Sequence, residues 1–409
     1  MLPLEGVRIL EFCSLIAGPL GPRILADHGA QVIKVESERR PDGFRAGGGF
    51  GGMTPEQLAN RLCNFNAFNR SKLSASLDMT HPQAREIAYR LVRTSDVVID
   101  NFSYGVMQKW GMGYDALRAI RPDIIVVSLK GLGSTGPQQG YVCLGPTIMA
   151  FSGLTHLWNF PDPPEPVGSQ TAHPDYVVGG HVVVAILAAL RHRQRTGRGQ
   201  YIDVAMVETT AALLGPFYLD ALVNGRDPQP RGNWSPRAAP HNCYRCADLP
   251  GGDESWCVVS VWNDSQWNAF RQAVGDPAWA AAPQFATMLR RIRHTAELDG
   301  HMEAWTRQHP APEIVDILQA AGVPAGIVQS GKDLTNDPHL QARGFVAGVP
   351  HPEMTRAVFY PGLTISLTKT PGHLRRAPQW AEHNDYAYRE LLGLTAEEVA
   401  SLQQEGVLT

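Results

Sequence analysis

The sequence of 409 residues lacks a run of basic residues and any excess of positive charge. Its 36 Lys and Arg residues are balanced by 39 Asp and Glu residues, which gives a formal net charge of −3. Proteins that bind nucleic acid usually carry a basic surface that matches the phosphate backbone. The composition therefore argues against a nucleic-acid partner and is typical of a soluble globular protein.

Long apolar runs are also lacking. The longest covers residues 177–190, which is too short to span a bilayer, and it contains His181. The N-terminal apolar run includes Glu5, Arg8 and Glu11, so it does not resemble a signal peptide. We therefore expect a cytoplasmic protein without a membrane partner.

Cysteine is scarce, with six residues scattered over the chain. Cys243 and Cys246 form one C-x-x-C pair, which could be redox-active or half of a zinc site. A zinc site needs two more ligands at suitable spacing, and only the isolated His241 and Cys257 lie nearby. We expect reduced thiols and no metal site.

Several common nucleotide and hydrolase motifs are missing. No Walker A sequence and no G-x-S-x-G elbow occurs, so the sequence argues against a P-loop NTPase and against an α/β-hydrolase. The turn at residues 15–22 lacks the G-x-G-x-x-G arrangement, and Pro19 and Pro22 remove two amides that a pyrophosphate would need. Glu36 stands where a ribose-binding carboxylate would lie, so NAD stays open as a ligand.

The first 130 residues alternate between strand-like and helix-like runs. Strands are predicted at residues 7–12, 31–35, 73–77, 97–100 and 124–129, and helices at 23–28, 82–93, 104–110 and 115–120. The Gly-Pro pairs predict a loop over residues 14–22. Such alternation is typical of βαβ units, and it predicts an α/β fold with a doubly wound, Rossmann-like parallel sheet.

The character of the chain changes beyond residue 218. Residues 224–240 are rich in Pro, Gly and Arg and predict an extended linker, after which short helices and strands predict a smaller α+β domain. We therefore predict a large domain over residues 1–220, a small domain with its linkers over 221–334, and a return to the large domain over 335–409.

Ligands of doubly wound sheets collect beyond the carboxyl ends of the strands. Three of the four segments predicted to lie there contain glycine, and a group of cations accompanies them. These cations are Arg39, Arg40, Arg70, Lys72, Lys109 and Lys130. The mixture suits a ligand that carries phosphates, although each cation alone could be a solvated surface residue.

Asp175 precedes an apolar run, residues 176–193, that predicts a buried helix starting just after Pro174. The positive end of the helix dipole favours the ionised carboxylate there. Asp175 could cap the helix, which is the usual role of Asp at this place, or attack an electrophile. Gly179 and Gly180 each cost about 1 kcal/mol relative to Ala, so they predict a close approach by a ligand or by a neighbouring helix.

Motifs along the whole chain resemble the class III CoA transferases, the CaiB/BaiF or formyl-CoA transferase-like family. They are Leu4–Leu10, Ala17–Pro19, Gly29–Glu36, Asn69–Lys72, Asn101–Phe102, Gly111–Tyr114, Gly131–Pro137, Thr196–Gly199, Ala377–Asn384 and Leu391–Leu394. The resemblance implies transfer of CoA between an acyl-CoA and a carboxylic acid. It implies CoA thioesters as substrates, no tightly bound cofactor, and two ring-like subunits that interlock.

By the same resemblance, Asp175 matches the aspartate that attacks the acyl-CoA carbonyl and then carries CoA as a thioester. The CoA contacts carried over from the family are Ile16, Ala17, Arg39, Lys72, Asn101, Phe102 and Lys109, with Ile16 and Ala17 at the pantetheine and Arg39 near the adenine. Core packing is the simplest alternative role for Phe102, and a solvated surface position is the simplest alternative for Lys72.

The chain also departs from the family pattern. Gly145-Pro146 stands where many transferases carry Tyr and an acid, and where racemase relatives carry a His-Asp pair. Without that histidine the chain should not racemise α-methylacyl-CoA in the same way. Residues 145–148 and 173–176 are most similar to the branch that acts on succinyl-CoA and aromatic acids such as benzylsuccinate, in aromatic degradation.

Some members of that branch have two related subunits, so the resemblance implies a homodimer or a hetero-oligomer. Two alternatives to an active transferase stay open: an acyl-CoA racemase or epimerase of the same superfamily, and a non-catalytic subunit. A second carboxylate on the substrate would need a cation, and the sequence offers Arg45, Arg231 and Arg237 without choosing among them.

Overall fold

The computed structural model describes residues 1–46, 63–162, 169, 171–249 and 253–409. The chain divides into two compact units. The first comprises Met1–Thr155, Gly168–Arg226 and Gln341–Thr409, and the second comprises His156–Val167 and Asp227–Leu340. The domain boundaries given above, at residues 220 and 334, stay a prediction.

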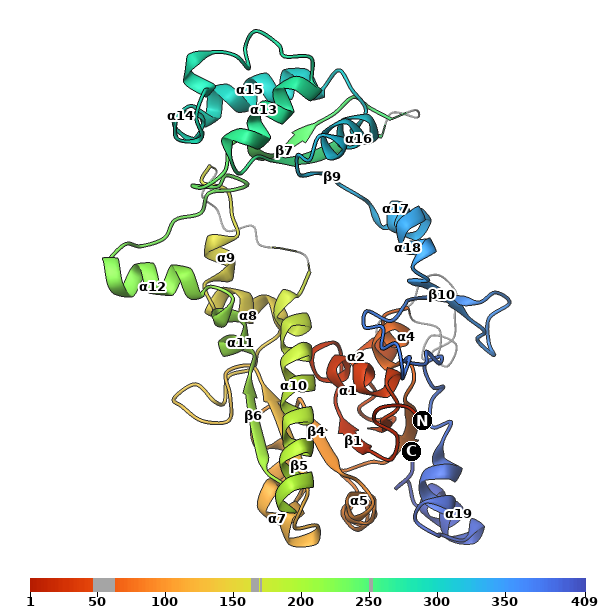
Figure 1. The fold of residues 1–409 in the computed structure, drawn as a ribbon. Coiled ribbons are helices and arrows are strands. Elements are labelled where there is room, and N and C mark those ends of the chain that lie inside the picture. Colours follow the sequence, from red (N-terminus) through yellow and green to blue (C-terminus); the bar gives the residue numbers. More distant parts are fainter. Residues whose placement is uncertain (47–62, 163–168, 170, 250–252) are drawn as a thin grey trace. The chain divides into compact units, whose positions relative to one another are not determined.

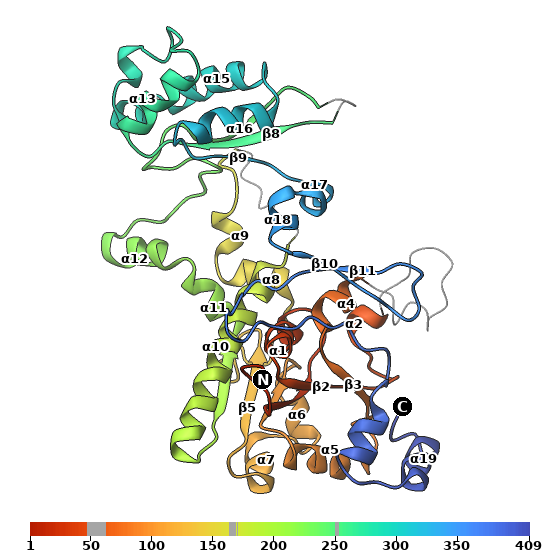
Figure 2. The same ribbon diagram turned by 45° about the vertical axis from the view of Figure 1, so that its right-hand side comes forward.

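Six parallel strands form the sheet of the first unit, in the order β3-β2-β1-β4-β5-β6 (Figures 1 and 2). They are β1 (Arg8–Phe12), β2 (Gln31–Glu36), β3 (Leu73–Ser76), β4 (Val97–Asp100), β5 (Ile125–Lys130) and β6 (Tyr201–Ala205). The order turns back on itself between β1 and β4, so the carboxyl ends of these two strands form a topological switch point. The predicted α/β fold with a doubly wound parallel sheet is confirmed.

Helices cover both faces of this sheet. Because successive strand residues point to opposite faces, Leu10 and Val98 belong to a core with α5 (Ala84–Arg93) and α7 (Tyr114–Ile120). Their neighbours Ile9 and Val97 belong to a second core with helices α1 and α10. Burial on both faces explains why β4 and β5 consist mainly of Val, Ile and Leu.

Helix α1 covers Ala17–Asp27, so the predicted loop over residues 14–22 is confirmed at residues 14–16 and wrong from Ala17 onward. Pro19 is the third residue of the helix, where its missing N–H would have no intrahelical partner. The glycines serve packing rather than turns. A Cβ at Gly18 would lie 2.7 Å from Asn101 Cγ, and one at Gly21 would lie 2.8 Å from Val182 Cγ1.

Helix α10 covers His173–Thr196 and packs along α1 (Figure 1). It begins two residues before Asp175, because Pro174 is tolerated as the second helical residue. A Cβ at Gly179 would lie 2.6 Å from Leu20 Cδ2, whereas one at Gly180 would have no atom within 4 Å. The predicted close approach is therefore confirmed at Gly179, where the approaching group is α1; at Gly180 no neighbouring helix approaches, and the approach of a ligand stays a prediction.

Only one face of α10 is buried, so the prediction of a buried helix holds for that face alone. On the other face Val184 is 68% exposed. By length and hydropathy the 24-residue helix could cross a bilayer, and 44% of its most apolar window is buried. The short apolar run therefore did not exclude such a span; what the structure shows is packing of α10 on α1 and on the sheet.

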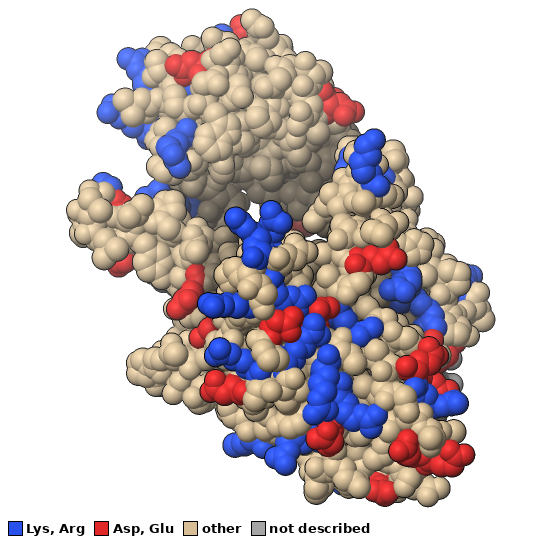
Figure 3. Space-filling model, turned by 60° about the horizontal axis from the view of Figure 1, so that its bottom comes forward, with Lys and Arg blue, Asp and Glu red and all other residues tan. Residues whose placement is uncertain are grey.

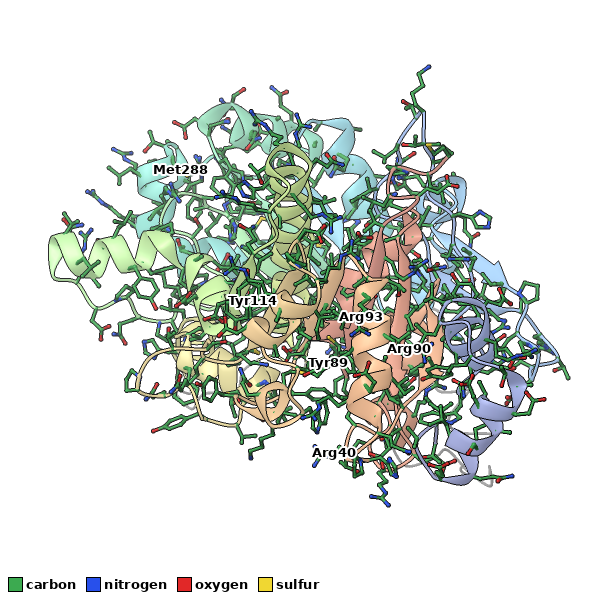
Figure 4. All side chains as sticks on the ribbon, turned by 90° about the horizontal axis from the view of Figure 1, so that it is seen from below. Arg40, Tyr89, Arg90, Arg93, Tyr114 and Met288 are labelled. Carbon is green, nitrogen blue, oxygen red and sulfur yellow. The ribbon has the colours of Figure 1, made fainter. Side chains whose placement is uncertain are left out.

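The C-terminal segment covers the edge strand β3. The Tyr388 hydroxyl donates to Ser76 O (2.6 Å), and Ser76 N donates to Asn384 Oδ1 (2.9 Å). Arg90, which projects from α5 in Figure 4, donates to Leu392 O (2.6 Å). The segment ends in α19 (Ala396–Gln404), as predicted. The two bonds to Ser76 occupy backbone groups that an edge strand would otherwise expose.

Short elements complete the first unit. They are α2 (Gly43–Ala46), α4 (Cys63–Asn69), α6 (Val106–Lys109), α8 (Gly145–Phe151), α11 (Met206–Ala212), α12 (Gly215–Asn224), β10 (Val346–Val349), β11 (Val358–Pro361) and a π-helical turn (Asp385–Glu390). Helices α9 (Leu154–Leu157) and α18 (Pro338–Ala342) lie where the chain passes between the units.

The second unit is a three-stranded antiparallel sheet with helices packed on it (Figure 2). Its elements are β7 (His241–Arg245), β8 (Trp256–Ser260), α13 (Asp264–Ala273), a 3-10 turn (Pro283–Phe285), α14 (Met288–Arg293), α15 (Thr295–Thr306), α16 (Ala311–Ala320), β9 (Ala325–Ile327) and α17 (Gly331–Asn336). Cys243 and Cys246 are free thiols. Within the described ranges, no three His, Cys, Asp or Glu side chains are grouped to hold a metal ion.

Candidate active site

Asp175 lies in the first turn of α10, as its third residue. The N-cap position belongs to Ala172, and no side chain caps the helix. The interpretation of Asp175 as an N-cap residue is therefore wrong. The Asp175 carboxyl group instead faces the backbone N–H of Ala17 at the start of α1, which together with its own N–H stabilises the ionised form.

The Asp175 carboxyl group is buried, with only 9% of the residue exposed. Its Oδ2 atom is inaccessible to solvent and has no hydrogen-bond partner. Burial raises the pKa of Asp175 to about 6, and the two backbone N–H groups oppose that rise. Asp175 is therefore mainly ionised at neutral pH, and leaving one carboxylate oxygen unpaired costs free energy that the fold must offset.

The space beside this oxygen exists because residue 145 has no side chain. A Cβ built on Gly145, the first residue of α8, would lie 2.2 Å from Asp175 Oδ2 and 2.7 Å from Ala172 Cβ. Both distances are far below van der Waals contact. Gly145 therefore permits the position of the Asp175 carboxylate.

The loop between β1 and α1 is fastened by Asn101, which follows β4. Ser14 N donates to Asn101 Oδ1, and Asn101 Nδ2 donates to Ser14 O, both at 2.9 Å. This exchange uses both ends of the Asn101 amide and holds Ile16 and Ala17 at the entrance to α1. The structure thus brings Ile16, Ala17 and Asn101 together around the switch point, with Ala17 against Asp175.

Lys72 is buried, so the interpretation of a solvated surface residue is wrong. Its ammonium group forms an ion pair with Glu11 (2.7 Å) and donates to Pro19 O and Asn69 Oδ1, both at 3.0 Å. Burial lowers the pKa of Lys72 to about 8, although Glu11 opposes that change. The ammonium group is fully engaged inside the protein, and its contact with CoA stays a prediction.

The other predicted CoA contacts lie at the surface. Arg39 is 75% exposed in its side chain and lies 3.4 Å from Asp78 Oδ2, and Lys109 is exposed at the end of α6. Phe102 is half-buried, with its ring edge-on to Trp110 at 5.2 Å. The predicted alternative role of Phe102 in core packing is therefore confirmed, and Arg39 and Lys109 are the solvent-exposed cations among these predicted contacts.

Three of the six cations predicted to accompany a phosphate are instead paired inside the protein. Besides Lys72, Arg70 contacts Asp27 at 2.8 Å, and Lys130 forms a buried ion pair with Asp100. Acidic and basic side chains also intermingle on the face shown in Figure 3. The charge pattern of the sequence therefore overstated the cations that are free to bind a ligand.

Glu36 and Arg45 form a buried ion pair with each other. Arg45 Nε lies 3.1 Å from Glu36 Oε2, and the guanidinium stacks 3.5 Å from the centre of the Phe65 ring. Because both side chains are buried, Glu36 does not present a carboxylate to a ribose, and Arg45 does not present a guanidinium to a substrate. Arg231 and Arg237 are exposed residues of the second unit.

Sequence reasoning missed residues that surround Asp175. Tyr176, the next residue along, contacts Phe68 of α4 with ring centres 5.9 Å apart. The positive charge of Arg23 on α1 lowers the pKa of the Tyr176 hydroxyl. Tyr176 belongs to the segment 173–176 noted in the sequence, but Phe68 and Arg23 match no motif, because only the packing of α1, α4 and α10 brings them to Tyr176. The pattern of apolar residues on α1 could have indicated which face meets α10, but not the partner residue.

Comparisons with known proteins agree with this architecture. Residues 4–384 match the model of CoA-transferase family III. A succinyl-CoA–D-citramalate CoA-transferase from Chloroflexus aurantiacus is 33% identical over 408 residues, which cover 99% of this chain and 98% of the relative. The beta subunit of a succinyl-CoA–L-malate CoA-transferase from the same organism is 28% identical over 412 residues, 100% of this chain and 98% of the relative.

A solved structure shares the fold as well. The crystal structure of a CAIB/BAIF family protein from Brucella suis superposes with a TM-score of 0.85 and 32% sequence identity, over 95% of this chain and 99% of that chain. The match to the family model includes both the switch point and Asp175. The chain therefore belongs to CoA-transferase family III, and the protein is a CoA-transferase.

Proposed function

We propose that this transferase moves CoA from succinyl-CoA to a carboxylic acid, with Asp175 as the covalent carrier. One observation carries the proposal: the Asp175 carboxylate is buried against the Ala17 amide, with Oδ2 free of any hydrogen bond. A carboxylate in that position is desolvated, oriented and ionised at neutral pH. These are the properties that nucleophilic catalysis requires.

The first half of the reaction loads the enzyme. An Asp175 oxygen attacks the thioester carbonyl of succinyl-CoA, forming a mixed anhydride and releasing CoA as thiolate. The thiolate then attacks the Asp175 carbonyl carbon, forming an aspartyl-CoA thioester and releasing succinate. Each step exchanges acyl derivatives of comparable reactivity, so no ATP is needed.

The second half reverses these steps with another acid. The carboxylate of the acceptor attacks the aspartyl-CoA carbonyl and expels the CoA thiolate, which leaves an anhydride between Asp175 and the acceptor. The thiolate attacks the acceptor carbonyl of this anhydride, so the new acyl-CoA leaves and the Asp175 carboxylate is restored. The Ala17 amide is positioned to stabilise the negative oxygen of the tetrahedral intermediates at Asp175.

The acceptor that we propose is an aromatic or dicarboxylic acid of the benzylsuccinate type. The names of both relatives pair succinyl-CoA with an acid that carries two carboxylates. Racemisation of an acyl-CoA would need a base beside the α-carbon. The position at which racemase relatives carry a His-Asp pair holds Gly145 and Pro146, which supply none.

A second chain completes the proposed enzyme, as a homodimer or with a related subunit. Val184 of α10 is exposed, as noted above. Helix α12 also carries exposed apolar residues: Leu219, Leu222 and Val223 are 62%, 80% and 75% exposed. Large exposed apolar patches mark protein interfaces. The beta-subunit relative makes a related partner chain a real alternative to a second copy.

Isotope exchange tests the covalent step without knowledge of the acceptor. Labelled succinate should enter succinyl-CoA in the presence of the wild-type protein alone, and Asp175→Ala should abolish that exchange. Asp115→Ala is the matched control, because Asp115 is an exposed first-turn aspartate of α7. Exchange at the wild-type rate in Asp175→Ala would refute the role of Asp175.

A further inference from the structure

Arg23 is a cation on α1 that lacks an adequate partner. Its side chain is partly exposed, while Nε is inaccessible to solvent and has no hydrogen-bond partner. Its hydrogen bond from Nη1 to Ala67 O is long, at 3.4 Å. Burial, and then the nearby Arg70 guanidinium, lower the pKa of Arg23 to about 10, so the group stays charged at neutral pH.

The nearby carboxylate is already taken. Asp27, one helical turn further along α1, accepts from Arg70 Nη2 at 2.8 Å and from Arg70 Nε at 3.1 Å. It also accepts from the Ser71 hydroxyl at 2.8 Å. Two guanidinium groups therefore share one carboxylate, and the excess positive charge rests on Arg23. A partly buried cation of this kind is stabilised when an anion binds beside it.

Tyr176 links Arg23 to the proposed nucleophile, because it follows Asp175 in the chain and its hydroxyl interacts with the Arg23 charge. Burial raises the pKa of the Tyr176 hydroxyl; the Asp175 carboxylate raises it further, and the Arg23 guanidinium lowers it. Arg23 and Tyr176 also meet at α4, because Arg23 donates to Ala67 O and the next residue, Phe68, contacts the Tyr176 ring. Tyr176 is 45% exposed. Its ring continues into an aromatic row, because Phe68 contacts Tyr176 at 5.9 Å and Phe44 at 5.7 Å between ring centres.

We propose that Arg23, with the Tyr176 hydroxyl as a second donor, binds a carboxylate at the far end of the acyl group. The enzyme then selects CoA thioesters and acids that carry two carboxylates: one reacts at Asp175, and the other neutralises Arg23. A planar guanidinium suits a carboxylate because it can donate two parallel hydrogen bonds. The aromatic row lies beside the carbon chain or ring between the two carboxylates. This inference rests on the proposed function of Asp175.

The test compares two thioesters of equal chain length, succinyl-CoA and butyryl-CoA, which differ by the distal carboxylate. In Arg23→Gln the ratio of kcat/KM for succinyl-CoA to that for butyryl-CoA should fall roughly 10- to 100-fold, as expected for a lost charged hydrogen bond. Arg23→Lys should retain part of the ratio. The control is Arg93→Gln, because Arg93 is an exposed arginine of α5 that pairs with Glu86 (Figure 4).

Stability separates this role from a structural one. Removal of the Arg23 charge relieves repulsion from Arg70, so Arg23→Gln should unfold at the same temperature as the wild type or higher. A structural arginine would give a lower Tm when removed. A lower Tm together with an unchanged succinyl-to-butyryl ratio would overturn the proposal.

Failure of the subsite can be told apart from failure of the transferase mechanism. Wild-type protein that forms the Asp175 adduct equally fast from both thioesters would refute the subsite and leave the mechanism standing. If neither thioester gives an adduct, the mechanism fails. Calorimetric measurement of succinate binding then tests the role of Arg23 independently of the mechanism. Weaker succinate binding by Arg23→Gln than by wild type would then support the subsite, and equal binding would refute it.

Discussion

The Asp175 carboxylate occupies the space that a side chain at residue 145 would need. A Cβ at Gly145 would lie only 2.2 Å from Asp175 Oδ2, although the two residues lie in the first turns of different helices, α8 and α10. The close approach fixes where a buried, unpaired carboxylate oxygen points. The orientation of the proposed nucleophile therefore depends on a residue that does no chemistry itself.

Gly145→Ala should displace the Asp175 carboxylate and should also lower the Tm, because the new Cβ would lie 2.7 Å from Ala172 Cβ, which cannot rotate away. The backbone itself accepts Ala, because Ala is the better helix former and Gly145 has no positive φ that would strain it. A misplacement of about 1 Å at a reacting group can cost roughly 100-fold in rate, so succinate exchange should fall by about that factor. Rapid exchange in Gly145→Ala, with an unchanged Tm, would show that the contact does not matter.

The neighbouring glycines Gly179 and Gly180 of α10 should respond in opposite ways to substitution by Ala. A Cβ at Gly179 would lie 2.6 Å from Leu20, so Gly179→Ala should destabilise the protein by about 1–3 kcal/mol through overpacking. Gly180 faces open space, so Gly180→Ala should stabilise it by about 0.5–1 kcal/mol. Urea unfolding measures both free energies, and equal effects would contradict the packing of α1 on α10.

The rate of the half reaction should depend on pH through Asp175. Burial raises the pKa of Asp175 to about 6, and only the carboxylate attacks a thioester. Succinate exchange should therefore fall as the pH drops below about 6 and stay level above it. A pH profile that is flat from pH 5 to pH 8 would contradict this assignment.

The same pKa predicts the stability of Asp175→Asn. Because the pKa of Asp175 is higher in the folded state than in the unfolded state, its protonated form favours folding, and that contribution is lost as the pH rises from about 4 to about 6. At pH 8 the charged group opposes folding. Asp175→Asn should then be more stable than wild type by up to about 3 kcal/mol, measured by urea unfolding, while losing exchange. A destabilised Asp175→Asn would mean that the carboxylate is structural.

Lys72 should behave as a structural residue in stability measurements. It is paired with Glu11 in the core, and removal of one partner of a buried ion pair costs about 3–5 kcal/mol. We expect a loss of that size in Lys72→Met and a partial recovery when Glu11→Gln is added. Lys109→Met, at an exposed position, should change the free energy of unfolding by less than about 0.5 kcal/mol. Equal effects of the two lysine substitutions would refute the buried pair.

The sheet could be predicted from sequence because its strands are buried on both faces. Val97–Asp100 and Ile125–Lys130 are mainly apolar runs that end in a charged residue, with Ser128 as the one interruption, and this pattern is typical of a strand buried on both faces. Helix α1 could not, because Pro19 and Pro22 normally argue against a helix. Here Pro19 lies in the first turn, and the adjacent glycines let α10 and Asn101 approach.

The location of the site could be predicted from the sequence better than which of its charged side chains are free to bind a ligand. The resemblance singled out Asp175 and Ala17, which the structure places against each other. Whether a cation is free or paired depends on residues distant in sequence: Lys72 meets Glu11, 61 positions away. Arg23 is the opposite case: it matches no motif, and its guanidinium is left without a carboxylate because Asp27 is already bound to Arg70.

Mass spectrometry of the protein after incubation with succinyl-CoA tests the central claim most directly. The account predicts a covalent CoA adduct on the peptide that contains Asp175, released by hydroxylamine and absent from Asp175→Ala. Wild-type protein that catalyses exchange with no such adduct would contradict it. So would full activity in Asp175→Asn after deamidation has been excluded.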